Sequence, residues 1–131
     1  MRILIVEDDF TNRLLMQELL KSYGSCHVAI NGREGVVAAQ LALEADKPYD
    51  LICLDVMMPE MDGHEALRQI RGLEENRGIL PQKRAKIVMT TALNDIDNVN
   101  TAFTSEANAY VTKPIQKAKL LETLRKLKLI S

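Results

Sequence analysis

The chain alternates short apolar runs with longer amphipathic stretches five times. The runs at residues 3–6, 51–54 and 87–89 are unbroken, which is typical of strands covered on both faces. A second, weaker strand is expected at residues 26–30, and a fifth strand at residues 108–112. Strands that alternate with helices predict a parallel sheet joined by right-handed crossovers, and therefore a (βα)5 fold of the α/β class.

Apolar side chains recur at helical spacing between these strands. Asn31 and Asp62 are suitable helix caps, because a glutamate follows each of them three residues later. The fourth helix is expected to begin at Asn94 or Asp95. The apolar stripes are Phe10, Leu14, Leu15, Leu19 and Leu20; Val36, Val37, Ala39, Leu41 and Leu43; Ala66, Leu67 and Ile70; Val99, Ala102 and Phe103; and Leu120, Leu121, Leu124 and Leu127.

The polar stretch at residues 74–86 contains Gly78 and Pro81, and it predicts a frayed helix end followed by a long loop. Cys26 and Cys53 fall in strands that the first strand is expected to separate, which predicts two free thiols. His27 and His64 are interpreted as surface residues.

Length, charge and apolar content argue against several classes of function. The 131 residues suit one domain over residues 1–131, and the net charge of -1 gives no basic excess for direct nucleic-acid binding. No apolar run approaches the roughly 20 residues of a membrane span, so no membrane insertion is expected. The apolar start of the chain is too short for a signal peptide, which makes a cytoplasmic location the expectation.

Polar side chains stand where the expected strands end. In a parallel sheet these ends meet at one edge, where open α/β sheets build their sites. The side chains concerned are Glu7 and Asp8 after the first strand, Asp55 at the end of the third, Thr90 and Thr91 at the end of the fourth, and Lys113 at the end of the fifth.

Three carboxylates (Glu7, Asp8 and Asp55) and the Lys113 ammonium sum to -2 at neutral pH, so a divalent cation would balance the charge. Oxygen ligands alone favour Mg²⁺. Lys113 would then complement an anion beside the metal, most simply a phosphoryl group. Asp55 is suited to accept that group as an acyl phosphate.

These motifs resemble the receiver domain of bacterial two-component response regulators, of the chemotaxis-regulator type. The resemblance covers nearly the whole chain. It rests on the pair Glu7-Asp8, on Asp55 in the run Asp-Val-Met-Met-Pro-Glu-Met-Asp-Gly, on Thr91-Ala92, and on Tyr-Val-Thr-Lys-Pro ending at Pro114. It implies a flavodoxin-like, doubly wound sheet with strand order 2-1-3-4-5.

The resemblance also implies roles for single residues. Asp55 would take the phosphoryl group from a phosphohistidine on a histidine kinase or phosphotransfer protein. Asp8, Asp55 and the backbone carbonyl of Met57 would bind Mg²⁺, with Glu7 acting through water. Lys113 would pair with Asp55 and then with the phosphoryl group, beside a cis bond to Pro114.

Switching would follow from two further residues. Thr91 would move to bond a phosphoryl oxygen, and Tyr110 would swing inward. The surface of the fourth helix, fifth strand and fifth helix would then change for an unknown downstream protein. The chain would be a signalling phosphoacceptor with intrinsic self-phosphorylation and self-dephosphorylation, rather than a conventional enzyme.

At two places in the sequence, adjacent residues could each match the same position of the family motif. The acidic pair is taken as Glu7-Asp8 rather than Asp8-Asp9 from the position of Arg13, and Ala92 favours Thr91 over Thr90. Met57 and Leu93 are apolar where family members often place polar groups that steer a hydrolytic water. Their apolar character predicts slow self-dephosphorylation.

Three other functions fit the sequence less well. A flavodoxin-like cofactor-binding protein would need a hydroxyl- or glycine-rich phosphate loop where the acids of residues 7–9 stand. An aspartyl-phosphate phosphatase would carry a second aspartate at the position of Met57. A degenerate receiver that only docks to a partner would not need the complete set of acids and Lys113.

Overall fold

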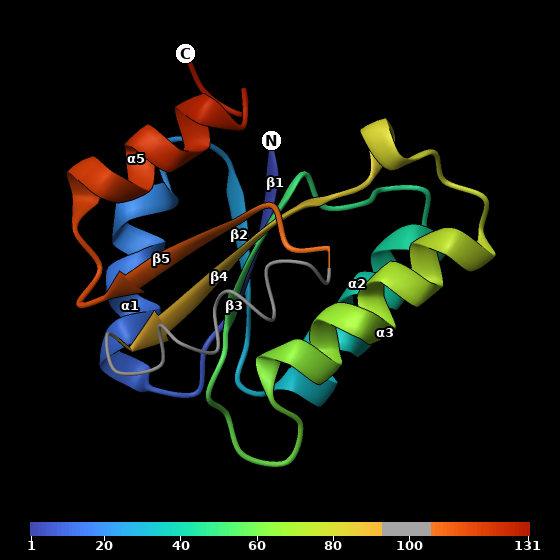
Figure 1. Ribbon diagram of the computed structural model, residues 1–131, viewed down its shortest axis with the longest axis horizontal. Helices are drawn as coiled ribbons and strands as arrows, with labels where there is room; N and C mark the ends of the chain where they lie inside the picture. Colours follow the sequence, from blue (N-terminus) through green and yellow to red (C-terminus); the bar gives the residue numbers. More distant parts are fainter. Residues whose placement is uncertain (93–105) are drawn as a thin grey trace.

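The computed structural model describes residues 1–92 and 106–131 (Figure 1). Its five strands are parallel and form one sheet in the order β2-β1-β3-β4-β5, which confirms the predicted α/β architecture. The strands are β1 (Arg2–Val6), β2 (Ser25–Ala29), β3 (Leu51–Asp55), β4 (Lys86–Ala92) and β5 (Ala109–Lys113).

Helices cover both faces of the sheet (Figure 1). The helix α1 (Phe10–Leu20) lies on the same face as α5 (Lys117–Lys126), and α2 (Gly32–Glu44) lies beside α3 (Gly63–Asn76) on the other. No helix in the described ranges is both long and apolar enough to cross a membrane. The helix expected from Asn94 or Asp95, with Val99, Ala102 and Phe103, lies outside the described residues, as does Leu93.

Alternate residues of each central strand enter two separate cores. Leu4 and Ile52 pack toward α2 and α3, whereas Ile5 and Cys53 pack toward α1 and α5. Because neither face of β1, β3 or β4 meets solvent, every position favours an apolar side chain. This double burial explains the unbroken apolar runs.

Three helices begin with a side-chain cap, and two of these caps, Asn31 and Asp62, were predicted. In α1, α2 and α3 a side-chain oxygen accepts the backbone N–H three residues later, at 2.8–2.9 Å, whereas no side chain caps α5. The pairs are Asp9 with Asn12, Asn31 with Glu34, and Asp62 with Glu65.

The stripe assigned to the first helix is partly wrong. Phe10 is 66% exposed and Leu14 48% exposed, whereas Met16 and Leu20 are the buried residues of α1. Helical spacing alone does not say which apolar stripe faces the sheet, and here Met16 and Leu20, one turn apart, fill that position. Leu19 is partly buried against the same core, and Leu15, like Phe10 and Leu14, is exposed.

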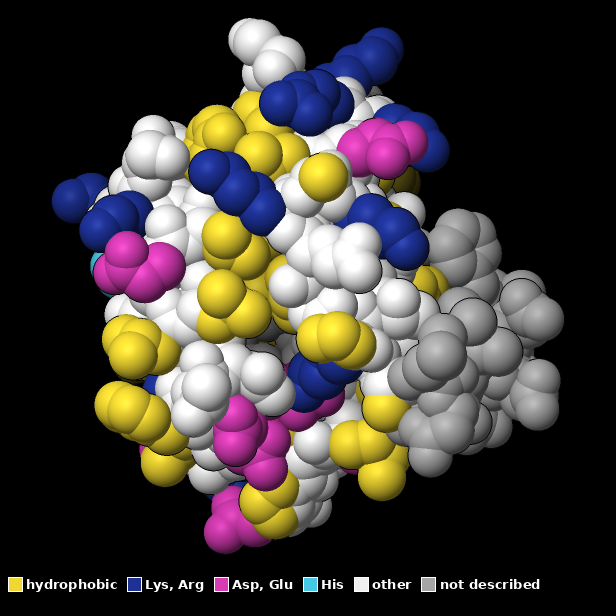
Figure 2. All heavy atoms as spheres, turned by 90° about the vertical axis from the view of Figure 1, so that its left-hand side faces the viewer, with side chains coloured by type: hydrophobic (Ala, Val, Ile, Leu, Met, Phe, Trp, Pro, Cys, Tyr) yellow, Lys and Arg dark blue, Asp and Glu magenta, His cyan; other side chains and the backbone are white. Residues whose placement is uncertain are grey.

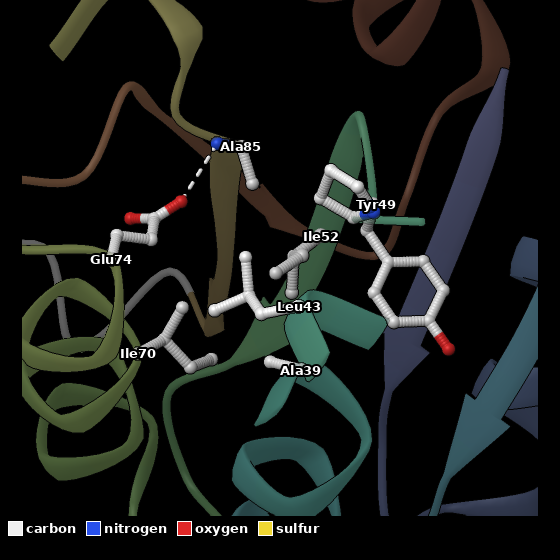
Figure 3. Close-up of a pocket in the computed structure, with 8 residues that line it drawn as sticks. Ala39, Leu43, Tyr49, Ile52, Ile70, Glu74 and Ala85 are labelled. Atoms are coloured by element: carbon white, nitrogen blue, oxygen red, sulfur yellow. Dashed lines mark hydrogen bonds between the residues drawn. The ribbon is translucent and has the colours of Figure 1, made fainter. Parts of the chain in front are cut away.

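The prediction for residues 74–86 is also wrong in part. The helix α3 continues to Asn76, and a short 3-10 helix, η1 (Pro81–Lys83), follows. Glu74 is buried: one carboxylate oxygen lies 2.7 Å from Arg71 and the other accepts the Ala85 N–H at 2.8 Å. Figure 3 shows Glu74 reaching Ala85 beside a small apolar hollow. This segment is therefore held by contacts of the buried Glu74 with Arg71 and Ala85, which the sequence pattern around residues 74–86 does not predict.

Both cysteines are free thiols, as predicted, because β1 lies between their strands. Burial raises the pKa of Cys53 to about 12, so its thiol is inert at neutral pH.

The two histidines differ in their surroundings. His27 is exposed, as expected, and its Nδ1 lies 2.7 Å from the Tyr49 hydroxyl. His64 is half-buried, and its Nε2 has no hydrogen-bond partner in the described part of the chain. It shares a helix stripe with Leu67 and Arg71, both buried, which explains why it is not a surface residue.

Candidate functional site

Three acids meet at the carboxyl edge of the sheet. Glu7 and Asp8 directly follow β1, and Asp55 ends β3. One carboxylate oxygen from each lies within 4.8 Å of the others. Glu7 and Asp55 are buried and Asp8 is exposed, so the cluster opens to solvent on one side. Asp9 instead caps α1, which supports the choice of Glu7-Asp8 as the pair.

The turn that carries these acids is held by Arg13. Its Nη1 donates to the backbone carbonyl of Glu7 at 3.0 Å and to that of Asp8 at 3.5 Å. Sequence reasoning used Arg13 only to align the motif. Its place four residues after the Asp9 cap, one helical turn into α1, is the signal that a side chain there can reach back to the turn.

Lys113 joins the cluster from the end of β5. Its Nζ lies 2.7 Å from Glu7 Oε1 and 3.2 Å from Asp55 Oδ1. The Lys113–Pro114 peptide bond that follows is cis, as the resemblance implied. The predicted convergence of acids and an amine at one edge is therefore confirmed.

Burial and mutual repulsion set the charges. Burial, the nearby Glu7 carboxylate and a hydrogen bond with it raise the pKa of Asp55 to about 8, although Lys113 opposes the change. Burial also acts to raise the pKa of Glu7, but hydrogen bonds with Asp55 and Lys113 outweigh it and the pKa is lowered. Burial acts to lower the pKa of Lys113, and the two carboxylates outweigh it and raise that pKa.

One oxygen of this cluster needs a further partner. Glu7 Oε2 is buried and meets no donor within the described residues, unless Asp55 holds a proton that the two carboxyls share. An unsatisfied buried acceptor is costly, so a shared proton or a cation is required there. With three carboxylates and no nitrogen or sulfur ligand in the cluster, the donor set fits a hard divalent cation.

The loop after Asp55 is fixed by a close approach at Gly63. The Gly63 N–H donates to the Val56 carbonyl at 2.9 Å, and a Cβ at residue 63 would overlap the Asp55 carbonyl oxygen. Met57, whose side chain is 64% exposed, lies in this loop, and its N–H donates to Asp55 Oδ1 at 3.3 Å. Only glycine allows α3 to begin this close to the end of β3.

The two threonines of β4 occupy different faces. Thr90 is the register partner of Asp55 in the sheet, so it shares the Asp55 face. Thr91 alternates with it and falls on the face of Met89 and Tyr110, toward α2 and α3. The Thr91 hydroxyl donates to the Ala92 carbonyl at 3.4 Å. The structure thus places Thr91 and Tyr110 on one face of the sheet. Asp55 belongs to the opposite face, so the strand register does not pair Asp55 with Thr91 or with Tyr110.

Known proteins share this sequence pattern along nearly the whole chain. The model of the response regulator receiver domain family matches residues 3–125. The two-component response regulator ORR41 of Oryza sativa subsp. japonica is 37% identical over 98% of this chain and 94% of its own. The sensory/regulatory protein RpfC of Xanthomonas campestris is 31% identical over 95% of this chain, which spans only 16% of RpfC.

Solved structures share the fold. The receiver domain of the Pseudomonas aeruginosa sensor histidine kinase PA1611, solved with magnesium in its active-site cleft, is 29% identical, with a TM-score of 0.76 over 95% of this chain and 94% of that one. The co-crystal structure of the Saccharomyces cerevisiae phosphotransfer protein Ypd1 with the Ssk1 receiver domain matches with 30% identity and a TM-score of 0.81, over 96% of this chain and 87% of the matched chain. This chain belongs to the response regulator receiver domain family.

Proposed function

We propose that Asp55 accepts a phosphoryl group from a phosphohistidine on a histidine kinase or phosphotransfer protein. The observation that carries this proposal is the buried Asp55 carboxyl beside Glu7, with Lys113 in contact with both carboxylates. Residues 1–131 would act as one receiver domain. Histidine phosphorylation draws on cellular ATP, so the proposed location is the cytoplasm.

The transfer is a single displacement at phosphorus. An Asp55 oxygen forms the new P–O bond while the P–N bond to the donor imidazole breaks. The electron pair stays on the imidazole nitrogen, which takes a proton from solvent. Asp55 has to be ionised for this attack, and its pKa of about 8 opposes ionisation at neutral pH. Lys113, 3.2 Å from Asp55 Oδ1, is placed to pair with the phosphoryl oxygens after transfer.

Asp8, Asp55 and the backbone carbonyl of Met57 would bind Mg²⁺, with Glu7 acting through water. Within the described part of the chain, Glu7 Oε2 has no donor other than a proton shared with Asp55, and this buried oxygen and the all-oxygen cluster support the assignment. When bound, the ion supplies positive charge that neutralises the carboxylates and the incoming phosphoryl oxygens. Such charge would also favour the ionised form of Asp55.

The response would pass from the phosphoryl group to Thr91 and Tyr110. Their placement on one sheet face supports a coupled movement, in which Thr91 bonds a phosphoryl oxygen and Tyr110 moves inward. The altered surface would comprise the fourth helix, β5 and α5. Its reader would be a downstream protein, with no direct contact to nucleic acid or membrane. Intrinsic self-phosphorylation and slow self-dephosphorylation complete the proposal.

A protein donor is supported by apolar side chains beside the acidic rim. Phe10 begins α1 next to the Asp9 cap, and the exposed Met57 lies two residues after Asp55. On the side of the molecule that carries α1 and α5, hydrophobic side chains lie among acidic ones toward the carboxyl edge (Figure 2). Exposed apolar groups around a charged site favour docking of a folded partner over a free phosphate ester.

The other functions fit the site poorly. The acids Glu7 and Asp8 occupy the place where a flavodoxin-like cofactor binder would need phosphate-binding groups. Met57 offers no carboxyl for the proton transfer that a phosphatase requires.

Intact-mass analysis with Mg²⁺ and acetyl phosphate tests the core chemistry. Wild type is expected to gain one phosphate, and Asp55→Asn none. Asp9→Asn is the matched control, because it neutralises an acid of the same loop that caps α1 and lies outside the cluster. It is expected to be phosphorylated like wild type. Phosphate on the Asp55→Asn protein would overturn the assignment.

A further inference from the structure

A polar hollow of about 290 Å³ lies at the opposite edge of the sheet from Asp55. It sits where β4 and β5 begin, beside the C-terminal end of α3 and η1 (Figure 1). The lining residues are Arg71, Pro81, Arg84, Ala85, Glu106 and Asn108. Three of them come from the longer connection after α3, which therefore builds one wall of a pocket.

Arg71 forms the rigid back of this hollow. Its guanidinium is bonded to Glu74 at 2.7 Å, to the backbone carbonyls of Ala85 and Glu106, and to the Asn108 side-chain oxygen at 2.8 Å. The side chain is 7% exposed, and Glu74 balances its charge. Four fixed partners leave Arg71 no freedom to move, so it supports the site without supplying free charge.

Arg84 supplies the free charge. Its Nε donates to the Ile79 carbonyl at 2.9 Å, which fixes the plane of the guanidinium. Across the described residues its two terminal nitrogens bond no acceptor and its charge meets no acid within ion-pair distance. A half-buried guanidinium held at one edge presents its remaining donors in a fixed fork.

Asn108 adds a second fixed donor. Its side-chain oxygen accepts from Arg71 and from the Ile87 N–H at 2.7 Å, so the orientation of the amide is set. The amide nitrogen makes no hydrogen bond with any described residue, although Asn108 lines the hollow. Two residues from separate elements, each with N–H groups that bond no described acceptor, therefore line the same hollow, and Glu106 is the one acidic residue among those that line it.

We propose that this pocket binds the oxyanion of a small molecule, a phosphate or carboxylate group, between the Arg84 guanidinium and the Asn108 amide. A planar fork of N–H donors matches the paired oxygens of either group. Because both donors are already held in place, binding costs little further ordering. Glu106 opposes the anion and sets the affinity below what Arg84 and Asn108 alone would give. The site is independent of phosphorylation at Asp55.

Side-chain NMR provides the test, with the Arg84 Nε–H and Asn108 amide signals followed during titration. The probes are inorganic phosphate and succinate, at constant ionic strength and without Mg²⁺. Saturable shifts of these signals with either probe support the site, and the tighter probe identifies the preferred group. Arg84→Gln is expected to weaken binding by about tenfold. Glu106→Gln is expected to tighten it severalfold, because it removes the opposing charge.

Lys83→Gln is the matched control, since Lys83 is an exposed cation that neighbours Arg84 and does not line the hollow. Its affinity is expected to stay within about twofold of wild type. Shifts that rise linearly without saturation, or equal losses in the Lys83 and Arg84 variants, would overturn the proposal. If the Arg84 variant does not fold, the Glu106 variant still decides: unchanged affinity there contradicts a site that faces Glu106.

Discussion

Replacing Asp55 with asparagine is expected to stabilise the metal-free protein, although it removes the proposed phosphoacceptor. The buried Asp55 carboxyl has a pKa of about 8 against an ordinary value of 3.8. At pH 7 the unfolded chain gains free energy by ionising this carboxyl, whereas the folded state mostly keeps the proton. The difference disfavours the folded state by roughly 4 kcal/mol as an upper limit, at about 1.4 kcal/mol for each pH unit between 3.8 and 7. Water and the coupled Glu7 and Lys113 charges relax part of this cost, so we expect a gain of about 1–3 kcal/mol.

The pH dependence separates this cause from other effects of the substitution. The folded pKa of Asp55 lies above its unfolded value, so its contribution to stability is present below about pH 4 and is lost as the pH rises through about 8. Glu7, with a lowered pKa, loses its contribution only as the pH falls, and Lys113, with a raised pKa, only in the alkaline range. The advantage of the asparagine variant should therefore grow from pH 5 to pH 8 and then level.

Urea unfolding followed by circular dichroism, in the presence of a chelator at several pH values, measures this difference. Asp9→Asn serves as the control, because it removes an exposed charge and keeps a capping side chain. Added Mg²⁺ should stabilise wild type more than the Asp55 variant, since the variant lacks one carboxylate ligand. A stability difference that does not change with pH, or a variant less stable than wild type, would refute the reasoning.

Three further experiments test other parts of the site. Gly63→Ala should destabilise the fold by roughly 1–3 kcal/mol in denaturant titrations, because its Cβ overlaps backbone at the end of β3; an unchanged midpoint would contradict the close approach. Thr91→Val should abolish the effect of beryllofluoride and Mg²⁺ on the Tyr signals in NMR spectra, whereas Thr90→Val should retain it; the opposite pattern would assign the role to Thr90. Met57→Asn combined with Leu93→Glu should accelerate acyl-phosphate decay severalfold in a mass-spectrometric time course, and no acceleration would count against a steering role.

The sheet and the site at its carboxyl edge could be predicted, because burial of both faces of a strand produces an unbroken apolar run in the sequence. Each central strand contains an unbroken apolar run, and the polar residue that follows this run marks the carboxyl edge. Topology then brings Asp55 beside Glu7 and Lys113, although Lys113 is 106 positions from Glu7 in the sequence. The sequence does not show whether Thr90 or Thr91 shares the sheet face of Asp55, because this depends on the strand register. The structure pairs Asp55 with Thr90.

The buried charges could not be predicted for a different reason. Arg71 and Glu74 fit the pattern of a solvated helix end, since charged side chains are rarely buried without partners. Their partners at Ala85 and Asn108 lie 11 to 37 residues away, beyond any local period. A similar limit applies to α1. The sequence shows that the helix is rich in apolar residues, but it does not show that Phe10 points to solvent.

The strand β5 links these two buried charge systems. Asn108, just before the strand, is bonded to Arg71, and Lys113, at its end, contacts Glu7 and Asp55. A phosphoryl group on Asp55 would change the charge balance only at the Lys113 end, because among the described residues the Arg71 network and the acidic cluster have no member in common. Any rearrangement of β5 would therefore be anchored at its start and largest near its end. Because β5 lies at an edge of the sheet and pairs only with β4, such a movement breaks fewer backbone hydrogen bonds than the same movement of a central strand would.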